Sequence, residues 1–297
     1  MSYEILYPFG YLILGFLFAK TSLEHKIHFR WYISAFLAKV CIPLVIAYTV
    51  AYRERGVFII MLALFFILGI MLLLSFAFTK DSLLSLCFSF LNMGWLGIPI
   101  AQALFGDRAS AVMIIGCVAS SIFGNSLGAG ILIKEHGLAI RLKRILKSPP
   151  FLALLVGIAL NFFGQTWQPY LYDIYHIAKV LMSILGMMIL GVWVAYIKIS
   201  AADFRLACTS AFYRGIVFSV LISGLVFLGY HNHYALITEN LKTLYLMALL
   251  PPAANIVVLE TYYLRSGRSA PLIVAGTLLS LALVIIYAVV LNLVFKV

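Results

Sequence analysis

The chain has 297 residues, of which 64% are hydrophobic and only 10% are charged, and it carries a formal net charge of +11. Soluble domains are nearer half apolar and a quarter charged, so this composition excludes a soluble enzyme and predicts an all-α protein with many membrane spans. The basic residues lie in short connecting segments, which argues against a nucleic acid partner and favours contact with anionic membrane lipids.

Ten apolar segments are long enough to cross the hydrocarbon core of a membrane, which takes about 20 helical residues. They cover residues 3–19, 32–52, 57–79, 83–105, 109–133, 150–165, 174–197, 204–229, 239–264 and 270–295. The four cysteines fall within or beside these segments without the spacing of a metal site, so no metal site is predicted.

Lysine and arginine residues are divided unevenly between the two sets of loops that connect these spans. The first set carries thirteen of them, and the second carries five, which are Arg53, Arg55, Arg108, Lys242 and Lys296. Loops rich in Lys and Arg stay in the cytoplasm. The sequence therefore predicts a multi-pass protein of a bacterial inner (cytoplasmic) membrane, with both termini outside.

The longest basic loop, from Lys134 to Lys147, divides the ten spans into two groups of five. Because five is odd, the second group enters the membrane with the opposite polarity, which is the arrangement of an inverted repeat. The predicted parts are a first five-helix repeat (residues 1–133), a basic cytoplasmic linker (134–148) and a second, inverted five-helix repeat (149–297).

Two spans contain residues that interrupt a helix. The fourth contains "NMGWLGIPI" (92–100), where a break is expected from Gly94 to Pro99, and the ninth contains "LLPPAANIVVLE" (249–260), where Pro251 and Pro252 lie near the middle. Proline removes a backbone donor, and broken backbone at this depth is tolerated only where protein or a watery cavity surrounds it. Matching breaks in two halves indicate the binding site of a transporter.

Each break would create half-helix ends whose free amides and partial positive charge can hold a carboxylate. Asparagines near the breaks and on the fifth span would add directional hydrogen bonds, although small residues there also permit simple packing. The predicted substrate-binding residues are Asn92, Gly94, Gly97, Pro99, Asn125, Pro251, Pro252 and Asn255.

Three ionisable residues lie well inside spans, away from the loops: Glu260, Arg214 and Lys39. A carboxylate inside a membrane is costly unless it is paired, hydrated or protonated, so Glu260 is predicted to couple transport to an ion or to pair with a charge. Arg214 or Lys39 would then be the counter-charge for Glu260 or for an anion. The alternative for both cations is that their long side chains reach the membrane surface.

Several of these segments resemble those of a known family. The stretch "NMGWLGIPIAQALFG" (92–106) resembles the Asn-x-Gly-x-x-Gly-x-Pro…Phe-Gly motif of the auxin efflux carrier family, which includes plant PIN-type auxin carriers and bacterial dicarboxylate carriers. The segments "AKVCIPLVIAYTVA" (38–51), "KSPPFLALLVGIALNFFG" (147–164), "LGMMILGVWVA" (185–195) and "LLPPAANIVVLETYY" (249–263) resemble other parts of that family in the same order.

The resemblance implies a scaffold domain and a crossing domain in which helices four and nine are broken and cross at mid-membrane. It also implies an elevator-type carrier of small organic anions, such as malonate, malate or an auxin-like acid, and a homodimer is a reasonable expectation. The long central loop of many plant members is replaced here by a short basic linker.

The two alternatives to an organic-anion carrier are a sodium-coupled symporter and a membrane enzyme. A sodium-coupled carrier of the bile-acid symporter type shares the ten-helix plan, and there Glu260, Asn125 and serine oxygens would bind the hard cation. A membrane enzyme is not expected, because neither Gly-x-Ser-x-Gly nor His-Glu-x-x-His occurs. No cofactor is predicted beyond a coupling proton or sodium ion, and the sequence leaves the substrate and the direction of transport open.

Overall fold

The computed structural model describes residues 6–21, 29–52, 57–132, 146–147, 149–162, 168–196, 198, 200–264 and 266–295. These ranges are almost entirely helical, and the one β-bridge that they contain lies outside any strand. The first half comprises α1 (Leu6–Ala19), α3 (Phe29–Phe36), η2 (Leu37–Cys41), α4 (Ile42–Ala51), α5 (Val57–Thr79), α6 (Ser82–Ser89), η3 (Met93–Gly97), α7 (Ile98–Phe123), η4 (Gly124–Gly128) and α8 (Ala129–Leu132).

The second half comprises α10 (Pro149–Phe162), α11 (Gln168–Tyr196), α12 (Ala201–His231), α13 (Ala235–Thr238), α14 (Leu241–Leu246), η6 (Met247–Leu249), α15 (Asn255–Leu264) and α16 (Ser269–Phe295). By length and apolar composition, five described helices can cross a membrane: Val57–Thr79, Met93–Phe123, Gln168–Ile189, Ala201–His231 and Ser269–Leu293. The protein is therefore an all-helical, membrane-embedded protein, as its composition predicts.

The end of α5 shows how local sequence sets these boundaries. The helix coincides with the predicted segment 57–79 and carries no charged residue along its length. It ends at Lys80, whose φ of 57° lies in the left-handed region that a helix cannot continue through. Asp81 then caps α6, because its carboxylate accepts hydrogen bonds from the amides of Leu83 and Leu84.

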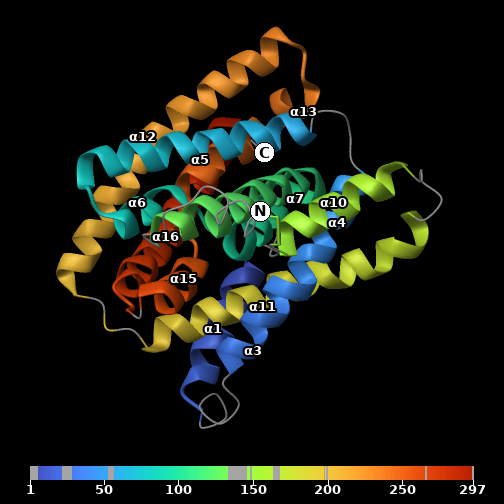
Figure 1. The fold of residues 1–297 in the computed structure, drawn as a ribbon. Coiled ribbons are helices and arrows are strands. Elements are labelled where there is room, and N and C mark those ends of the chain that lie inside the picture. Colours follow the sequence, from blue (N-terminus) through green and yellow to red (C-terminus); the bar gives the residue numbers. More distant parts are fainter. Residues whose placement is uncertain are drawn as a thin grey trace.

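Figure 1 shows the helices in two groups on either side of α7. In the first group α1 packs along α11, and α4 packs against both α10 and α11. In the second group α5 packs against α6, and α12 packs against α5 and α16. We call these the α1/α4/α10/α11 group and the α5/α6/α12/α16 group. The helix α7, which follows the first break, contacts members of both groups.

Glycines hold α1 and α11 close together. A Cβ atom added at Gly15 would lie 2.0 Å from the backbone oxygen of Met188, and one added at Gly191 would lie 1.9 Å from the backbone oxygen of Leu12. Backbone therefore faces backbone at both crossing points. Small residues at such positions allow the close helix approach that stabilises helix pairs in membranes.

We expect Gly191→Ala to lower the free energy of unfolding by about 3 kcal/mol, because the added methyl group forces α1 and α11 apart. Gly224 of α12 is the matched control, since a Cβ atom there meets no other atom within 4 Å. Gly224→Ala should instead raise stability by about 0.5–1 kcal/mol, because alanine is the better helix former. Thermal unfolding of the purified variants in detergent measures both effects, and a similar loss in the two variants would contradict this account of the crossing.

Candidate functional site

Two helices are interrupted and the interruptions cross. The helix α6 ends at Ser89 and η3 begins at Met93, whereas η6 ends at Leu249 and α15 begins at Asn255. The intervening residues form an antiparallel bridge in which Leu91 pairs with Pro252. The amide of Asn92 donates to the carbonyl of Pro251 at 2.9 Å, and the amide of Ala253 donates to the carbonyl of Phe90 at 2.8 Å. Each break thus satisfies backbone groups that the other leaves free.

The first break lies earlier than the sequence predicts. It was expected from Gly94 to Pro99, but residues 93–97 form a turn of π-helix and Pro99 lies in the first turn of α7. Proline is tolerated at such a position, since the wider turn before it absorbs the missing hydrogen bond. The glycines serve packing instead: a Cβ atom at Gly94 would lie 2.9 Å from Cys117, and one at Gly97 would lie 2.8 Å from Met113.

Asn92 caps the half-helix that follows the first break. Its side-chain oxygen accepts a hydrogen bond from the amide of Trp95 at 3.2 Å. The side chain is only 4% exposed, and its Nδ2 has no hydrogen-bond partner among the described residues. A buried amide without a partner costs free energy that a bound acceptor can recover. Asn92 therefore offers two donor hydrogens to a ligand in the crossing.

A small cavity of about 30 Å³ lies at this crossing. That volume exceeds the roughly 10–15 Å³ that one water molecule needs, so it can hold water or one end of a ligand. A larger molecule requires its walls to move apart. The cavity is lined by Phe90, Leu91, Asn92, Gly94, Trp95, Cys117, Ser120, Ser121, Ala253, Ala254 and Asn255.

The structure brings together part of the predicted site. Asn92, Gly94 and Asn255 line the cavity, and Pro251 and Pro252 lie in the extended segment beside it. Gly97 and Pro99 are buried in the next turns without lining it. Asn125 belongs to the π-helical turn Gly124–Gly128, and the position of its side chain lies outside the described residues.

The third wall of the cavity comes from α7, and the site predicted from the sequence does not include it. Cys117, Ser120 and Ser121 of this helix line the cavity. Ser120 also donates a hydrogen bond to the carbonyl of Leu91 at 3.0 Å and so supports the extended segment. The three- and four-residue spacing from Cys117 places all of them on one helix face, and that spacing is the signal that could have found them.

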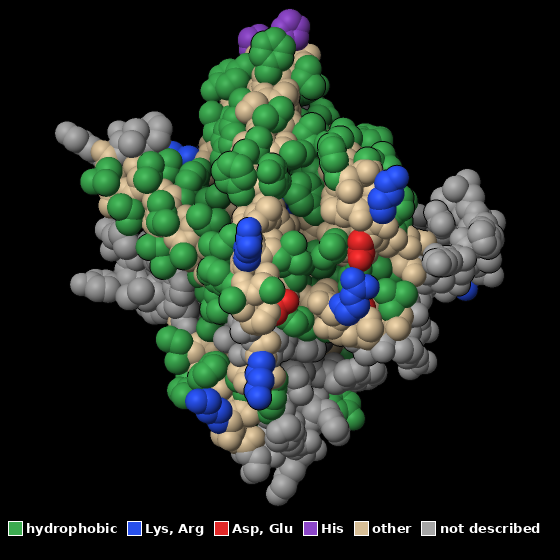
Figure 2. Space-filling view, turned by 90° about the vertical axis from the view of Figure 1, so that its left-hand side faces the viewer, with side chains coloured by type: hydrophobic (Ala, Val, Ile, Leu, Met, Phe, Trp, Pro, Cys, Tyr) green, Lys and Arg blue, Asp and Glu red, His purple; other side chains and the backbone are tan. Residues whose placement is uncertain are grey.

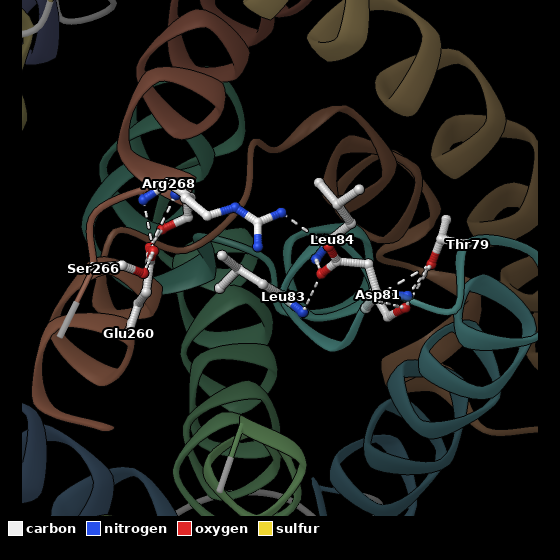
Figure 3. A network of polar contacts seen from close by, with 9 residues as sticks. Thr79, Asp81, Leu83, Leu84, Glu260, Ser266 and Arg268 are labelled. Atoms are coloured by element: carbon white, nitrogen blue, oxygen red, sulfur yellow. Dashed lines mark hydrogen bonds and ion pairs between the residues drawn. The ribbon is translucent and has the colours of Figure 1, made fainter. Parts of the chain in front are cut away.

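Glu260 finds its partners at the start of the next helix. The carboxylate is fully buried and accepts hydrogen bonds from the hydroxyl groups of Ser266 and Ser269 and from the amides of Arg268 and Ser269. Figure 3 shows Glu260 directed at this turn and Arg268 reaching from it toward Asp81. The carboxylate thus joins α15 to the N-terminus of α16, where a negative charge is favoured.

The two predicted counter-charges occupy different environments. Arg214 is only 2% exposed, and its Nε has no hydrogen-bond partner within the described part of the chain. Lys39 lies in η2 and is exposed. Neither side chain is among the described hydrogen-bond partners of Glu260. Charge pairing between Glu260 and Arg214 or Lys39 therefore stays a prediction, and the observed stabilisation of Glu260 comes from α16.

Asp81 connects the same turn to the start of α6. Its carboxylate accepts a hydrogen bond from Arg268 at 2.9 Å. Burial raises the pKa of Asp81, but the amides of Leu84 and Leu83 and the Arg268 guanidinium outweigh it, so the pKa is lowered overall from its ordinary value of 3.8. A lowered pKa means that the ionised group stabilises the folded state at neutral pH.

We therefore expect Asp81→Asn to lower the melting temperature at pH 6. Because the folded-state pKa is depressed, the contribution of Asp81 is full above 3.8 and is lost as the pH falls through the lowered value. The difference in melting temperature between the native chain and Asp81→Asn should accordingly shrink below pH 3.8. A difference that stays constant over this pH range would show that ionised Asp81 contributes no stability.

Within the described ranges, no group of three or more His, Cys, Asp or Glu side chains is placed to hold a metal ion. The chemistry that the crossing offers is hydrogen-bond donation from backbone and amide groups in a buried, narrow cavity. No protein-family profile and no curated protein sequence matches the chain.

Proposed function

We propose that the protein is a secondary transporter that moves a small organic anion, such as a carboxylate, through the crossing of its two broken helices. The observation that carries the proposal is the unpartnered Nδ2 of Asn92, which is buried at the cavity where the two breaks exchange hydrogen bonds. Such a donor suits an anion rather than a cation. Irregular backbone at membrane depth is tolerated where protein buries it or where it lines a cavity, and paired broken helices of this kind form the binding sites of many transporters.

The half-helix ends support an anionic ligand. The helical segment that begins at Met93 and the helix that begins at Asn255 both start beside the cavity. Helix N-termini carry a partial positive charge and expose amides, which together attract a carboxylate. The described lining residues include no acidic side chain that would repel one.

The packing also supports an inverted repeat of residues 1–133 and 149–297, joined by the linker 134–148. Gly15 of α1 packs against the backbone of α11, and Gly157 of α10 packs against the backbone of α4 in the same way. The segments "PFGYLILG" (8–15) and "PFLALLVG" (150–157) share Pro, Phe, Leu and Gly at equal spacing. In this proposal the chain has ten spans, and the positive-inside rule places both termini outside.

In an elevator mechanism the two helix groups would move relative to one another. We assign the α1/α4/α10/α11 group to the scaffold, and the α5/α6/α12/α16 group with α7 and α15 to the moving part that carries the cavity. The side chain of Lys179 on α11 donates to Gln102 at 2.8 Å and pairs with Asp107 at 3.1 Å, so it bridges the two parts in this conformation. Transport requires that this bridge break.

This mechanism agrees with the resemblance to auxin efflux carriers. The second candidate is a sodium-coupled carrier of the bile-acid symporter type. It is favoured by the carboxylate of Glu260 together with the hydroxyl groups of Ser266 and Ser269, which gather oxygen atoms of the kind that a hard cation prefers. In both cases the chain acts as a carrier and not as an enzyme.

Uptake into proteoliposomes tests the proposal. The native chain would be supplied with radiolabelled malonate, malate or indole-3-acetate under an imposed proton gradient or an imposed sodium gradient. We expect saturable uptake of at least one acid, above that of protein-free liposomes. Sodium-dependent uptake that loses its sodium dependence in Glu260→Gln would favour the symporter type. Failure to take up any acid under either gradient would overturn the anion-transport proposal.

A further inference from the structure

A second and larger cavity opens on the outer face of the α5/α6/α12/α16 group. It measures about 540 Å³, which is within the roughly 300–1,000 Å³ of small-molecule sites. We call it the α5/α12 groove. Its walls come from α5 and α6 on one side and from α12 with Leu272 of α16 on the other. Figure 2 shows the side of the molecule that lies on the left in Figure 1, with hydrophobic side chains over its upper part and most Lys and Arg side chains from mid-height downward, with acidic side chains among them.

The walls of the α5/α12 groove are apolar although several hydroxyl groups lie in them. The hydroxyl of Thr79 donates to the backbone oxygen of Ser75 at 2.9 Å, and that of Thr209 donates to the backbone oxygen of Arg205 at 2.9 Å. The Thr79 and Thr209 hydroxyl groups are therefore satisfied within their own helices and need no polar ligand. Phe78, at 86% exposed, and Tyr213, at 58%, stand at the groove with large apolar surfaces uncovered.

Three exposed cations surround one end of the α5/α12 groove. Lys80 directly follows the groove residue Thr79 at the end of α5. Arg205 lies one turn before Thr209 on α12, and Arg268 lies four residues before Leu272 of α16. Three of the helices that line the groove, α5, α12 and α16, thus have a basic residue next to their lining, whereas α6 begins after the acidic Asp81. Arg268 is already paired with Asp81 at 2.9 Å, which leaves Lys80 and Arg205 as the stronger donors.

We propose that the α5/α12 groove binds an anionic membrane phospholipid, with an acyl chain between α5 and α12 and the headgroup phosphate at Lys80 and Arg205. The apolar walls match a hydrocarbon chain, and the cations at one end match a phosphate. All three basic residues lie at or beside helix ends that the positive-inside rule assigns to the cytoplasmic side, where the leaflet carries anionic lipid. The site is separate from the crossing, and it does not depend on what the crossing transports.

A second copy of the chain fits this surface less well. A symmetric dimer through the α5/α12 groove would bring Lys80 and Arg205 of one copy against the same residues of the other. Facing like charges disfavour such an interface, and the net charge of +11 adds to the repulsion. The charge pattern therefore favours a lipid as the occupant.

Native mass spectrometry of the purified full chain tests the proposal. Phosphatidylglycerol and phosphatidylcholine with identical acyl chains would be titrated separately, and retained lipid would be counted. We expect the native chain to retain phosphatidylglycerol preferentially. Lys80→Gln with Arg205→Gln should weaken that binding about 30-fold, roughly fivefold for each cation removed, and leave phosphatidylcholine unchanged. Lys20→Gln is the matched control, because Lys20 is an exposed cation at the end of α1, outside the groove.

A second variant tests the acyl-chain part of the site. Ser210→Phe adds an aromatic ring inside the groove and should displace both lipids, whereas Val220→Phe, at a 65% exposed position of α12 outside the lining, should displace neither. Soluble glycerol phosphate added in excess should compete weakly, since it lacks the chain. Equal retention of the two lipids, or native-like phosphatidylglycerol binding in Lys80→Gln with Arg205→Gln, would overturn the proposal. So would full competition by glycerol phosphate, or a groove variant that changes the oligomeric state instead of lipid binding.

Discussion

Glu260→Ala is expected to lower the free energy of unfolding by about 3–5 kcal/mol, because it removes a buried acceptor and leaves its donors unsatisfied. Four donors from the Ser266–Ser269 turn converge on this fully buried carboxylate. Two of them are backbone amides that cannot turn away to find another partner. The loss should appear as a large drop in melting temperature in detergent.

Two comparisons identify the cause of that loss. Glu239→Ala removes a carboxylate that is 58% exposed and pairs with Arg108 at 3.2 Å, and it should change stability by less than about 1 kcal/mol. Glu260→Gln keeps the size of the side chain but points amide hydrogens at amide donors, so its effect should be intermediate. If Glu260→Ala melts at the same temperature as Glu239→Ala, then the turn at the start of α16 does not depend on the carboxylate.

Asn92→Ala is expected to weaken uptake of the transported acid by about 10- to 100-fold at low substrate concentration. The estimate follows from losing a hydrogen bond to a charged ligand, worth about 1.5–3 kcal/mol. The variant also loses the cap on Trp95, which costs about 1 kcal/mol of stability. Uptake into proteoliposomes, normalised to the amount of folded protein, separates the two losses.

Asn92→Asp distinguishes the ligand contact from the helix cap. Aspartate is as good a capping residue as asparagine, so the bond from Trp95 is retained, but the donor hydrogens are lost and a negative charge enters the cavity. We expect this variant to keep the cap but to lose stability through the buried charge and, with uptake normalised to folded protein, to take up no anion. Asn232→Ala, at an exposed position after α12, should transport normally. Native-like uptake by Asn92→Asp would remove Asn92 from the binding site.

Much of this architecture can be predicted from hydropathy and proline alone. The segment 57–79 is uniformly apolar and bounded by charged residues, so the predicted and observed α5 agree. Pro251 and Pro252 lack amide donors, and the chain is extended where they lie. The bounds of α5 and the extended chain at the two prolines depend on local residues, so they can be predicted from the sequence.

The first break and the partners of Glu260 depend on tertiary structure, and there the sequence misleads. Gly94 and Gly97 resemble helix breakers, but they remain helical because α7 packs closely on them. The break falls instead at Phe90–Asn92, where the second extended segment supplies hydrogen bonds from about 160 positions away. The sequence marks Glu260 as unusual, but its partners eight and nine residues along the chain are reached only through a turn that periodicity does not reveal.

The antiparallel bridge between the two breaks is made by main-chain atoms alone, through Asn92 with Pro251 and Ala253 with Phe90. Side chains can therefore be exchanged at all four positions without deleting either bond, and only a proline at 92 or 253 would remove a donor. Substitutions other than proline therefore leave the two main-chain hydrogen bonds of the crossing in place. The side chains that face the cavity can change meanwhile. Such a frame can acquire a new ligand preference by a few substitutions, without first having to evolve a new fold.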